Sequence, residues 1–220
     1  MLQAESRGLE LAVGLALPAT LGLIALAEPI VRMLFEHGAF TSGDTAATAQ
    51  ALIWLALGLP AHVLVKALSP AFFARNDTIT PLLAALTGFA VTIGLAVILG
   101  QIIGVAGIAA SIALGAWSSA LALLWRGAAT FGFSIDAAAR RRLPSIAASA
   151  LAMGGLLWLA VKLVPALAAG THGLVQAALL GLLIAGEIAI YGLLLALLGV
   201  VDWRQMIHMI RQNPVRDLRD

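Results

Sequence analysis

The sequence predicts an all-α integral membrane protein with six transmembrane helices. Apolar residues make up 61% of its 220 residues and charged residues only 11%, whereas soluble chains average about 45–50% and about 25%. The charges also leave long gaps, because no Asp, Glu, Lys or Arg occurs from Leu11 to Ala27 or from Thr78 to Trp125. A helix crosses a bilayer core of about 30 Å with about 20 residues, so the second gap is long enough for two spans.

Charge gaps and helix-breaking residues place each span. Thr80-Pro81 is typical of a helix start, because Thr caps free N–H groups and Pro suits the first helical position. Glycines on both sides of Gln101 indicate a turn between the third and fourth spans, and residues 170–173 (Gly-Thr-His-Gly) indicate one between the fifth and sixth. The expected spans are residues 10–28, 46–68, 81–99, 105–125, 144–163 and 174–199.

The basic residues predict the orientation of these spans. With both termini in the cytoplasm, ten arginines lie on the inner side, and only Arg32 and Lys162 lie on the outer side. This asymmetry follows the positive-inside rule. The ten are Arg7, Arg75, Arg126, Arg140, Arg141, Arg142, Arg204, Arg211, Arg216 and Arg219.

Two short amphipathic segments are expected to lie along the membrane surface. Ile30–His37 separates apolar from charged positions on the outer side, and Asp202–Gln212 does so on the inner side. Both patterns are typical of interfacial helices. A frayed extension of the sixth span is an alternative for the second segment.

Small residues recur every fourth position in the third and fourth spans. In lipid, helices associate through close van der Waals contact, which such stripes permit. Because a tight turn joins these two spans, we expect the stripes to face each other, although a chain rich in Ala and Gly also yields stripes by composition alone. The third span carries Ala84, Gly88, Thr92, Ala96 and Gly100, and the fourth carries Gly107, Ser111, Gly115 and Ser119.

Polar residues within or beside the spans are the candidate functional residues. Lys66 follows His62 by one helical turn, and Pro60 opens the helix beside them. If that face lines a wet cavity, the pair is suited to an anionic ligand; otherwise Lys66 extends its ammonium to the headgroups. Glu187, in the middle of the sixth span, is either a proton-coupling site or a protonated acid bonded to a neighbouring helix. Arg75 belongs to a polar elbow, Arg75-Asn76-Asp77, between the second and third spans. The default interpretation of this elbow is a plain cytoplasmic turn.

The sequence gives no indication of an enzyme, a cofactor or a metal site. Cysteine is absent, and there is no nucleophile elbow, H-E-x-x-H motif or phosphate-binding G-x-x-x-x-G-K-[ST] loop. Nucleic-acid binding is not expected, because the basic residues sit at helix ends and form no stripe with aromatics. Any transport is therefore expected to draw on an ion gradient or the membrane potential.

Several motifs resemble the MurJ (MviN) family of lipid II flippases, within the MOP-exporter superfamily. They are Leu17-Pro18-Ala19, residues 27–32 (AEPIVR), residues 34–40 (LFEHGAF), Gly58-Leu59-Pro60, residues 65–78 (VKALSPAFFARNDT) with Thr80-Pro81, and residues 104–109 (GVAGIA). The resemblance implies the C-terminal portion of such a transporter. It assigns residues 1–126 to the last four helices of the second lobe, 127–143 to a cytoplasmic basic loop, 144–200 to an additional helix pair and 201–220 to a cytoplasmic amphipathic tail.

The resemblance also implies a function at the bacterial inner membrane. Family members flip the lipid-linked peptidoglycan precursor, an undecaprenyl-pyrophosphate lipid, by alternating access, and the additional helix pair forms an apolar groove for the polyprenyl tail. His62, Lys66 and Arg75 are then the candidate substrate contacts, with membrane lipids and a separately encoded N-terminal lobe as partners. Ala96 and Ser119 stand where amides are expected around an ion, so a sodium site is not expected. The alternatives are another MOP-type exporter of oligosaccharide lipids or drugs, and a non-transporting membrane scaffold or relic.

Overall fold

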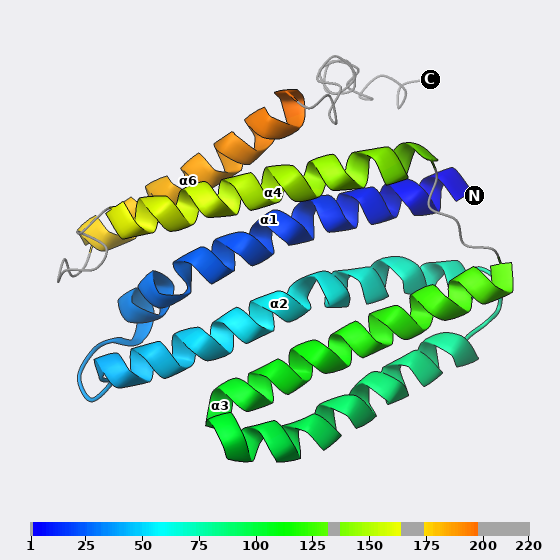
Figure 1. The fold of residues 1–220 in the computed structure, drawn as a ribbon, viewed down its shortest axis with the longest axis horizontal. Coiled ribbons are helices and arrows are strands. Elements are labelled where there is room, and N and C mark those ends of the chain that lie inside the picture. Colours follow the sequence, from blue (N-terminus) through cyan, green and yellow to red (C-terminus); the bar gives the residue numbers. More distant parts are fainter. Residues whose placement is uncertain (1, 132–136, 164–173, 198–220) are drawn as a thin grey trace, which may run out of the picture.

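The computed structural model describes residues 2–131, 137–163 and 174–197, and every element in these ranges is an α-helix. The helices lie side by side as a layer of long rods, with α1 between α2 and α4 (Figure 1). The all-α membrane class predicted from the sequence is confirmed. The helices are α1 (Leu2–Phe35), α2 (Ser42–Phe73), α3 (Ile79–Phe131), α4 (Ala137–Leu163) and α6 (Leu174–Leu197).

Five helices are long and apolar enough to span a membrane within the described ranges, where six were expected. The difference lies in α3, whose 53 residues include both the third and the fourth expected spans. Helical geometry fails at Ile103, with φ −127° and ψ 18°, and at Gly104, with φ 59°. Gly104 tolerates this positive φ because it has no Cβ. The break turns α3 back on itself, so that its two arms run antiparallel (Figure 1).

The two arms of α3 cross where glycine faces glycine. A Cβ on Gly88 would lie 2.7 Å from the Gly115 carbonyl oxygen, and a Cβ on Gly115 would lie 2.6 Å from the Gly88 carbonyl oxygen. Ser119 covers Gly88 and Thr92 covers Gly115 in the same reciprocal way. The structure therefore brings the two small-residue stripes together at backbone contact distance, as packing in lipid requires.

The polar side chains of these stripes are satisfied within their own arms. The hydroxyl of Ser111, which is fully buried, donates to the Gly107 carbonyl at 2.7 Å, and Thr92 donates to the Gly88 carbonyl at 2.9 Å. Gly107 in turn packs directly on the Leu99 carbonyl beside the turn. Because hydroxyls bonded to the preceding turn add no unpaired group to the seam, the arms meet through van der Waals contact.

The expected interfacial helix at Ile30–His37 is not a separate element. Helix α1 runs without interruption to Phe35, with Pro29 inside it. Membrane helices tolerate such prolines because neighbouring groups satisfy the freed backbone. The segment Asp202–Gln212 lies outside the described residues. Helix also covers both ends of the expected loop 127–143, since α3 ends at Phe131 and α4 begins at Ala137.

Helix α1 organises the packing, because it contacts α2, α4 and α6. On one side, Leu26 packs with Leu157 of α4 and Leu180 of α6. On the other side α2 continues the layer toward α3, where Phe72 packs with Leu123. Large apolar side chains remain exposed along all five helices, which is what a lipid environment favours. The domain division expected from the sequence stays a prediction.

Candidate functional site

His62 and Lys66 lie together on one face of α2. Both side chains are exposed, and they are one helical turn apart. Neither lines the cavities described below. The pair is therefore a small basic patch on a face of α2 that the other described helices leave open.

Pro60 disturbs the hydrogen bonding of α2 beside this pair. Proline has no N–H and pushes against the preceding turn, so the carbonyls three and four residues earlier lose regular helical donors. The indole N–H of Trp117, on the second arm of α3, donates to the Leu57 carbonyl at 3.0 Å. This donor comes from another helix, so it holds α2 against α3 close to Pro60.

The polar elbow between α2 and α3 is a pair of helix caps. Asn76 adopts a left-handed φ of 58°, and the N–H of Asp77 donates to the Phe72 carbonyl at 3.0 Å. This is the Schellman arrangement that ends many helices. Arg75 donates to the Ala71 carbonyl at 2.6 Å, which places a cation at the negative end of the α2 dipole.

Asp77 then begins the next helix. Its carboxylate accepts the Thr80 backbone N–H at 2.9 Å. This hydrogen bond is the main reason that the pKa of Asp77 lies below its ordinary value, and the Thr80 hydroxyl and the more distant Arg126 charge act in the same direction. The elbow is thus a well-formed turn, with the guanidinium of Arg75 at its edge.

Glu187 lies on the other side of the molecule, in a cavity of about 470 Å³ between α1, α4 and α6. Apolar side chains make up most of the lining, with Leu15 and Leu26 from α1, Met153 from α4 and Ile184 from α6. Since α1 separates α6 from α2 (Figure 1), Glu187 does not join the His62–Lys66 pair. The sequence-derived candidates therefore occupy two separate regions.

The carboxyl of Glu187 rests against the backbone of α1 at Gly22. A Cβ at Gly22 would overlap both carboxyl oxygens of Glu187. Because Gly22 has no side chain, the carboxyl of Glu187 fits against α1 at the α1–α6 contact. The sequence identified Glu187 as an intramembrane acid and left its neighbour open.

Tyr191, one turn beyond Glu187, makes a hydrogen bond that α1 lacks internally. Pro18 has no N–H, so it cannot donate to the Gly14 carbonyl four residues earlier. The Tyr191 hydroxyl donates to that carbonyl at 2.6 Å. This pairing was not foreseen from the sequence, although Pro18 signals an unpaired carbonyl at Gly14 and Tyr191 is the only tyrosine in the chain.

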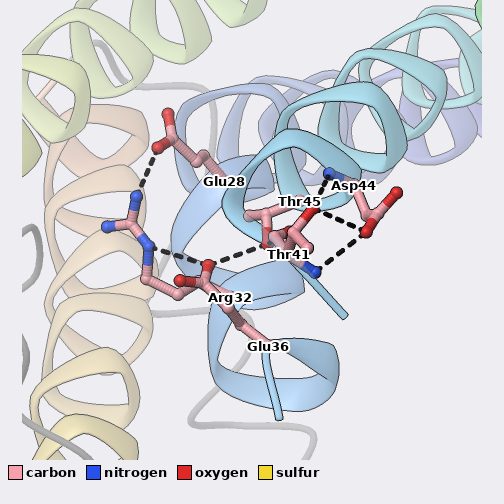
Figure 2. A network of polar contacts seen from close by, with 6 residues as sticks. All are labelled: Glu28, Arg32, Glu36, Thr41, Asp44 and Thr45. Atoms are coloured by element: carbon pink, nitrogen blue, oxygen red, sulfur yellow. Dashed lines mark hydrogen bonds and ion pairs between the residues drawn. The ribbon is translucent and has the colours of Figure 1, made fainter. Parts of the chain in front are cut away.

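A polar network joins the end of α1 to the start of α2 (Figure 2). Arg32 bridges two carboxylates of its own helix, Glu28 at 2.6 Å and Glu36 at 3.3 Å. Glu36 also accepts the Thr45 hydroxyl of α2 at 2.7 Å. The spacing of four residues on either side of Arg32 is the signal that sequence reasoning could have used to find this network.

The start of α2 carries its own cap within the same network. Thr41 and Asp44 form a reciprocal capping box, in which each side chain accepts the other residue's backbone N–H. In the described ranges, no group of three or more His, Cys, Asp or Glu side chains gathers to hold a metal ion. The polar groups described here are thus of three kinds: those that cap helix ends, the intramembrane acid Glu187, and the basic pair His62 and Lys66.

Comparisons with known proteins agree on one family. The family model for "Lipid II flippase MurJ" matches residues 1–177. A "Probable lipid II flippase MurJ" of Rhizobium tropici is 35% identical over 96% of this chain and 39% of its own length. A second, from Rhizobium meliloti, is 38% identical over 71% of this chain and 29% of its own length.

A solved structure shows the same fold. "Lipid II flippase MurJ, inward closed conformation" superposes with a TM-score of 0.71 at 28% identity, over 90% of this chain and 38% of that one. The chain thus spans 39% and 29% of the lengths of these two relatives and 38% of that structure. On its sequence and on its fold, this multi-pass membrane protein belongs to the MurJ lipid II flippase family.

Proposed function

We propose that this chain forms part of a flippase that moves a lipid-linked peptidoglycan precursor across the bacterial inner membrane by alternating access. The observation that carries the proposal is the family match, which extends from residue 1 to residue 177. The structural likeness to a MurJ flippase supports it, because the same helices recur in the same arrangement. The chain acts as a transporter and not as an enzyme.

The complete transporter needs helices beyond these. More than half of the matched relative from Rhizobium tropici lies outside the match, since the chain covers 39% of it. We assign the part that this chain does not cover to a first lobe, which closes a cavity against the exposed face of α2. Both termini of the present chain then lie in the cytoplasm, with Arg32 and Lys162 on the outer side.

His62 and Lys66 are the proposed contacts of the substrate's pyrophosphate. They form an exposed basic pair one turn apart, and a cation in a low-dielectric cavity binds phosphate oxygens strongly. We assign Arg75, two residues beyond the end of the same helix, to the headgroup as it enters from the inner side. We assign the polyprenyl tail to the apolar cavity between α1, α4 and α6, and proton coupling to Glu187 beside it.

Complementation tests this function. Cells depleted of their own flippase would receive the chain alone, or the chain with the remaining part of the Rhizobium tropici relative. We expect growth to be restored in the second case only. If neither combination supports growth while both proteins reach the membrane, the flippase role is rejected.

A charge substitution tests the substrate contact in the complementing pair. Lys66→Gln should lower the transport rate about tenfold, the worth of one charge-assisted hydrogen bond to phosphate, whereas Lys66→Arg should retain most of it. Lys162→Gln, which removes the other lysine of the chain at the opposite end of the bundle, is the matched control. Equal transport by Lys66→Gln and wild type would remove Lys66 from the site.

A non-transporting membrane scaffold is the alternative that the same experiment addresses. A scaffold would reach the membrane and fold, yet it would not restore growth even when the first lobe is present.

The orientation of the chain in the membrane is tested separately by labelling single cysteines. The sequence suits this experiment because it contains no cysteine of its own. A single cysteine at Ala39 should react with an impermeant maleimide from outside, and one at Arg141 should not.

A further inference from the structure

A second cavity lies at the end of the bundle opposite the α2–α3 elbow. It measures about 530 Å³ and is bounded by the last turns of α1 and α4 and the first turns of α2. Its deeper wall is apolar, with Ile24 from α1 and Ile53 from α2, and its rim carries Glu28, Arg32 and Lys162. It is distinct from the cavity that holds Glu187, and none of the proposed transport steps uses it.

The rim of this cavity is placed at the depth of lipid headgroups. Lys162 is the penultimate residue of the span Pro144–Leu163, and Arg32 lies in the last turn of α1. Trp158, one turn before Lys162, also lines the cavity. Tryptophan and lysine at the end of a span are typical of the interface between hydrocarbon and water.

The charges at the rim differ in how they are compensated. The guanidinium of Arg32 is shared between Glu28 and Glu36 (Figure 2). Lys162 makes no ion pair with any residue in the described part of the chain, and its ammonium lies 5.0 Å from the centroid of the Trp158 ring. The cavity thus offers one cation that the described structure leaves without an opposite charge.

An apolar cleft that opens at headgroup level beside such a cation is complementary to one class of ligand. We infer that this cavity binds a glycerophospholipid of the outer leaflet, with its phosphate on Lys162 and an acyl chain along the wall formed by Ile24 and Ile53. A free phosphate ion would leave the apolar wall uncovered, and a neutral lipid would leave the cation unpaired. The phospholipid satisfies both parts, because a basic residue at the surface attracts anionic lipid.

Native mass spectrometry of the full chain tests this site. The protein would be released from micelles that contain either phosphatidylglycerol or diacylglycerol with the same acyl chains. We expect tighter retention of phosphatidylglycerol, by about fivefold, which is the effect of one basic residue near anionic lipid. Lys162→Gln should remove this preference and Lys162→Arg should keep it.

Two further variants separate the site from general lipid adhesion. Ala46→Leu fills the cavity from an exposed position on its lining, and it should lower retention of both lipids. Arg126→Gln, which removes an exposed cation outside this cavity, should leave the preference unchanged. The inference is overturned if Lys162→Gln retains the fivefold preference, if Ala46→Leu binds as wild type does, or if inorganic phosphate alone displaces the lipid.

Discussion

The hydrogen bond between Tyr191 and the Gly14 carbonyl predicts a specific energetic coupling across the α1–α6 contact. Tyr191→Phe removes the donor and keeps the ring, so the Gly14 carbonyl loses the partner that replaces the N–H missing at Pro18. Hydrogen bonds between membrane helices average about 0.6 kcal/mol and reach about 1.7 kcal/mol. Because this acceptor has no donor at Pro18 and the distance is 2.6 Å, we expect a cost near the top of that range, about 1.5 kcal/mol.

Pro18→Ala provides the second arm of a double-mutant cycle. The restored N–H at position 18 can donate to the Gly14 carbonyl within α1, so the cost of Tyr191→Phe should then fall to about 0.5 kcal/mol. The assay is the separation of α1 from α6 on titration with SDS. Dyes on cysteines at the exposed positions Leu15 and Leu193 report it by energy transfer, since no native cysteine interferes.

The coupling of about 1 kcal/mol between the two substitutions is the decisive quantity. Equal costs of Tyr191→Phe in the two backgrounds would show that the hydroxyl does not compensate for Pro18. A cost near zero in the wild-type background would show that the bond contributes nothing to docking α6.

Three other predictions concern the same fold. Gly22→Ala should force Glu187 away from α1 and weaken the α1–α6 contact in the energy-transfer assay, and adding Glu187→Ala should recover most of the loss because the overlapping carboxyl is gone. Gly88→Val should destabilise the α3 hairpin by about 1–3 kcal/mol through overpacking. Gly94→Ala should not destabilise it, because a Cβ at Gly94 would have nothing within 4 Å. Equal midpoints of SDS unfolding for the two variants would contradict the packing of the two arms. Asp77 stabilises the fold above its unfolded pKa of about 4, and this stabilisation is lost as the pH falls through its lower folded pKa. The temperature of thermal unfolding should therefore change less between pH 5 and pH 2 for Asp77→Asn than for wild type.

The hairpin in α3 shows which features of the fold could be predicted from the sequence. Glycines and Gln101 predicted a turn between two apolar runs, and the structure breaks helical geometry at Ile103 and Gly104. Charge gaps located the other spans for the same reason, because a bilayer imposes length and composition on each helix separately. Such local constraints need no knowledge of neighbouring helices.

The end of α1 shows where local reasoning failed. The amphipathic pattern of Ile30–His37 suggested a separate interfacial helix, yet α1 continues through Pro29 to Phe35. A proline removes one helical hydrogen bond and does not by itself decide whether the chain continues as helix, since that depends on packing. Here Val31 is buried with Ala49 of α2, a contact that a single sequence does not reveal.

Contacts between distant helices were likewise beyond the sequence. Tyr191 and Gly14 are separated by 177 residues, and nothing in either local pattern indicates that α6 docks on α1. The basic pair His62 and Lys66 was found from spacing alone, because residues four apart share a helix face whatever the tertiary structure. Their role in transport stays a prediction.

The most direct test of the proposed function measures the substrate itself. In cells depleted of their own flippase, the fraction of lipid II accessible to an externally added lipid II-cleaving enzyme would be compared with and without this chain, in the presence of the remaining part of the Rhizobium tropici relative. The proposal predicts that the accessible fraction rises when the chain is present and falls back with Lys66→Gln. An accessible fraction that stays at the depleted level, with both proteins in the membrane, would contradict it.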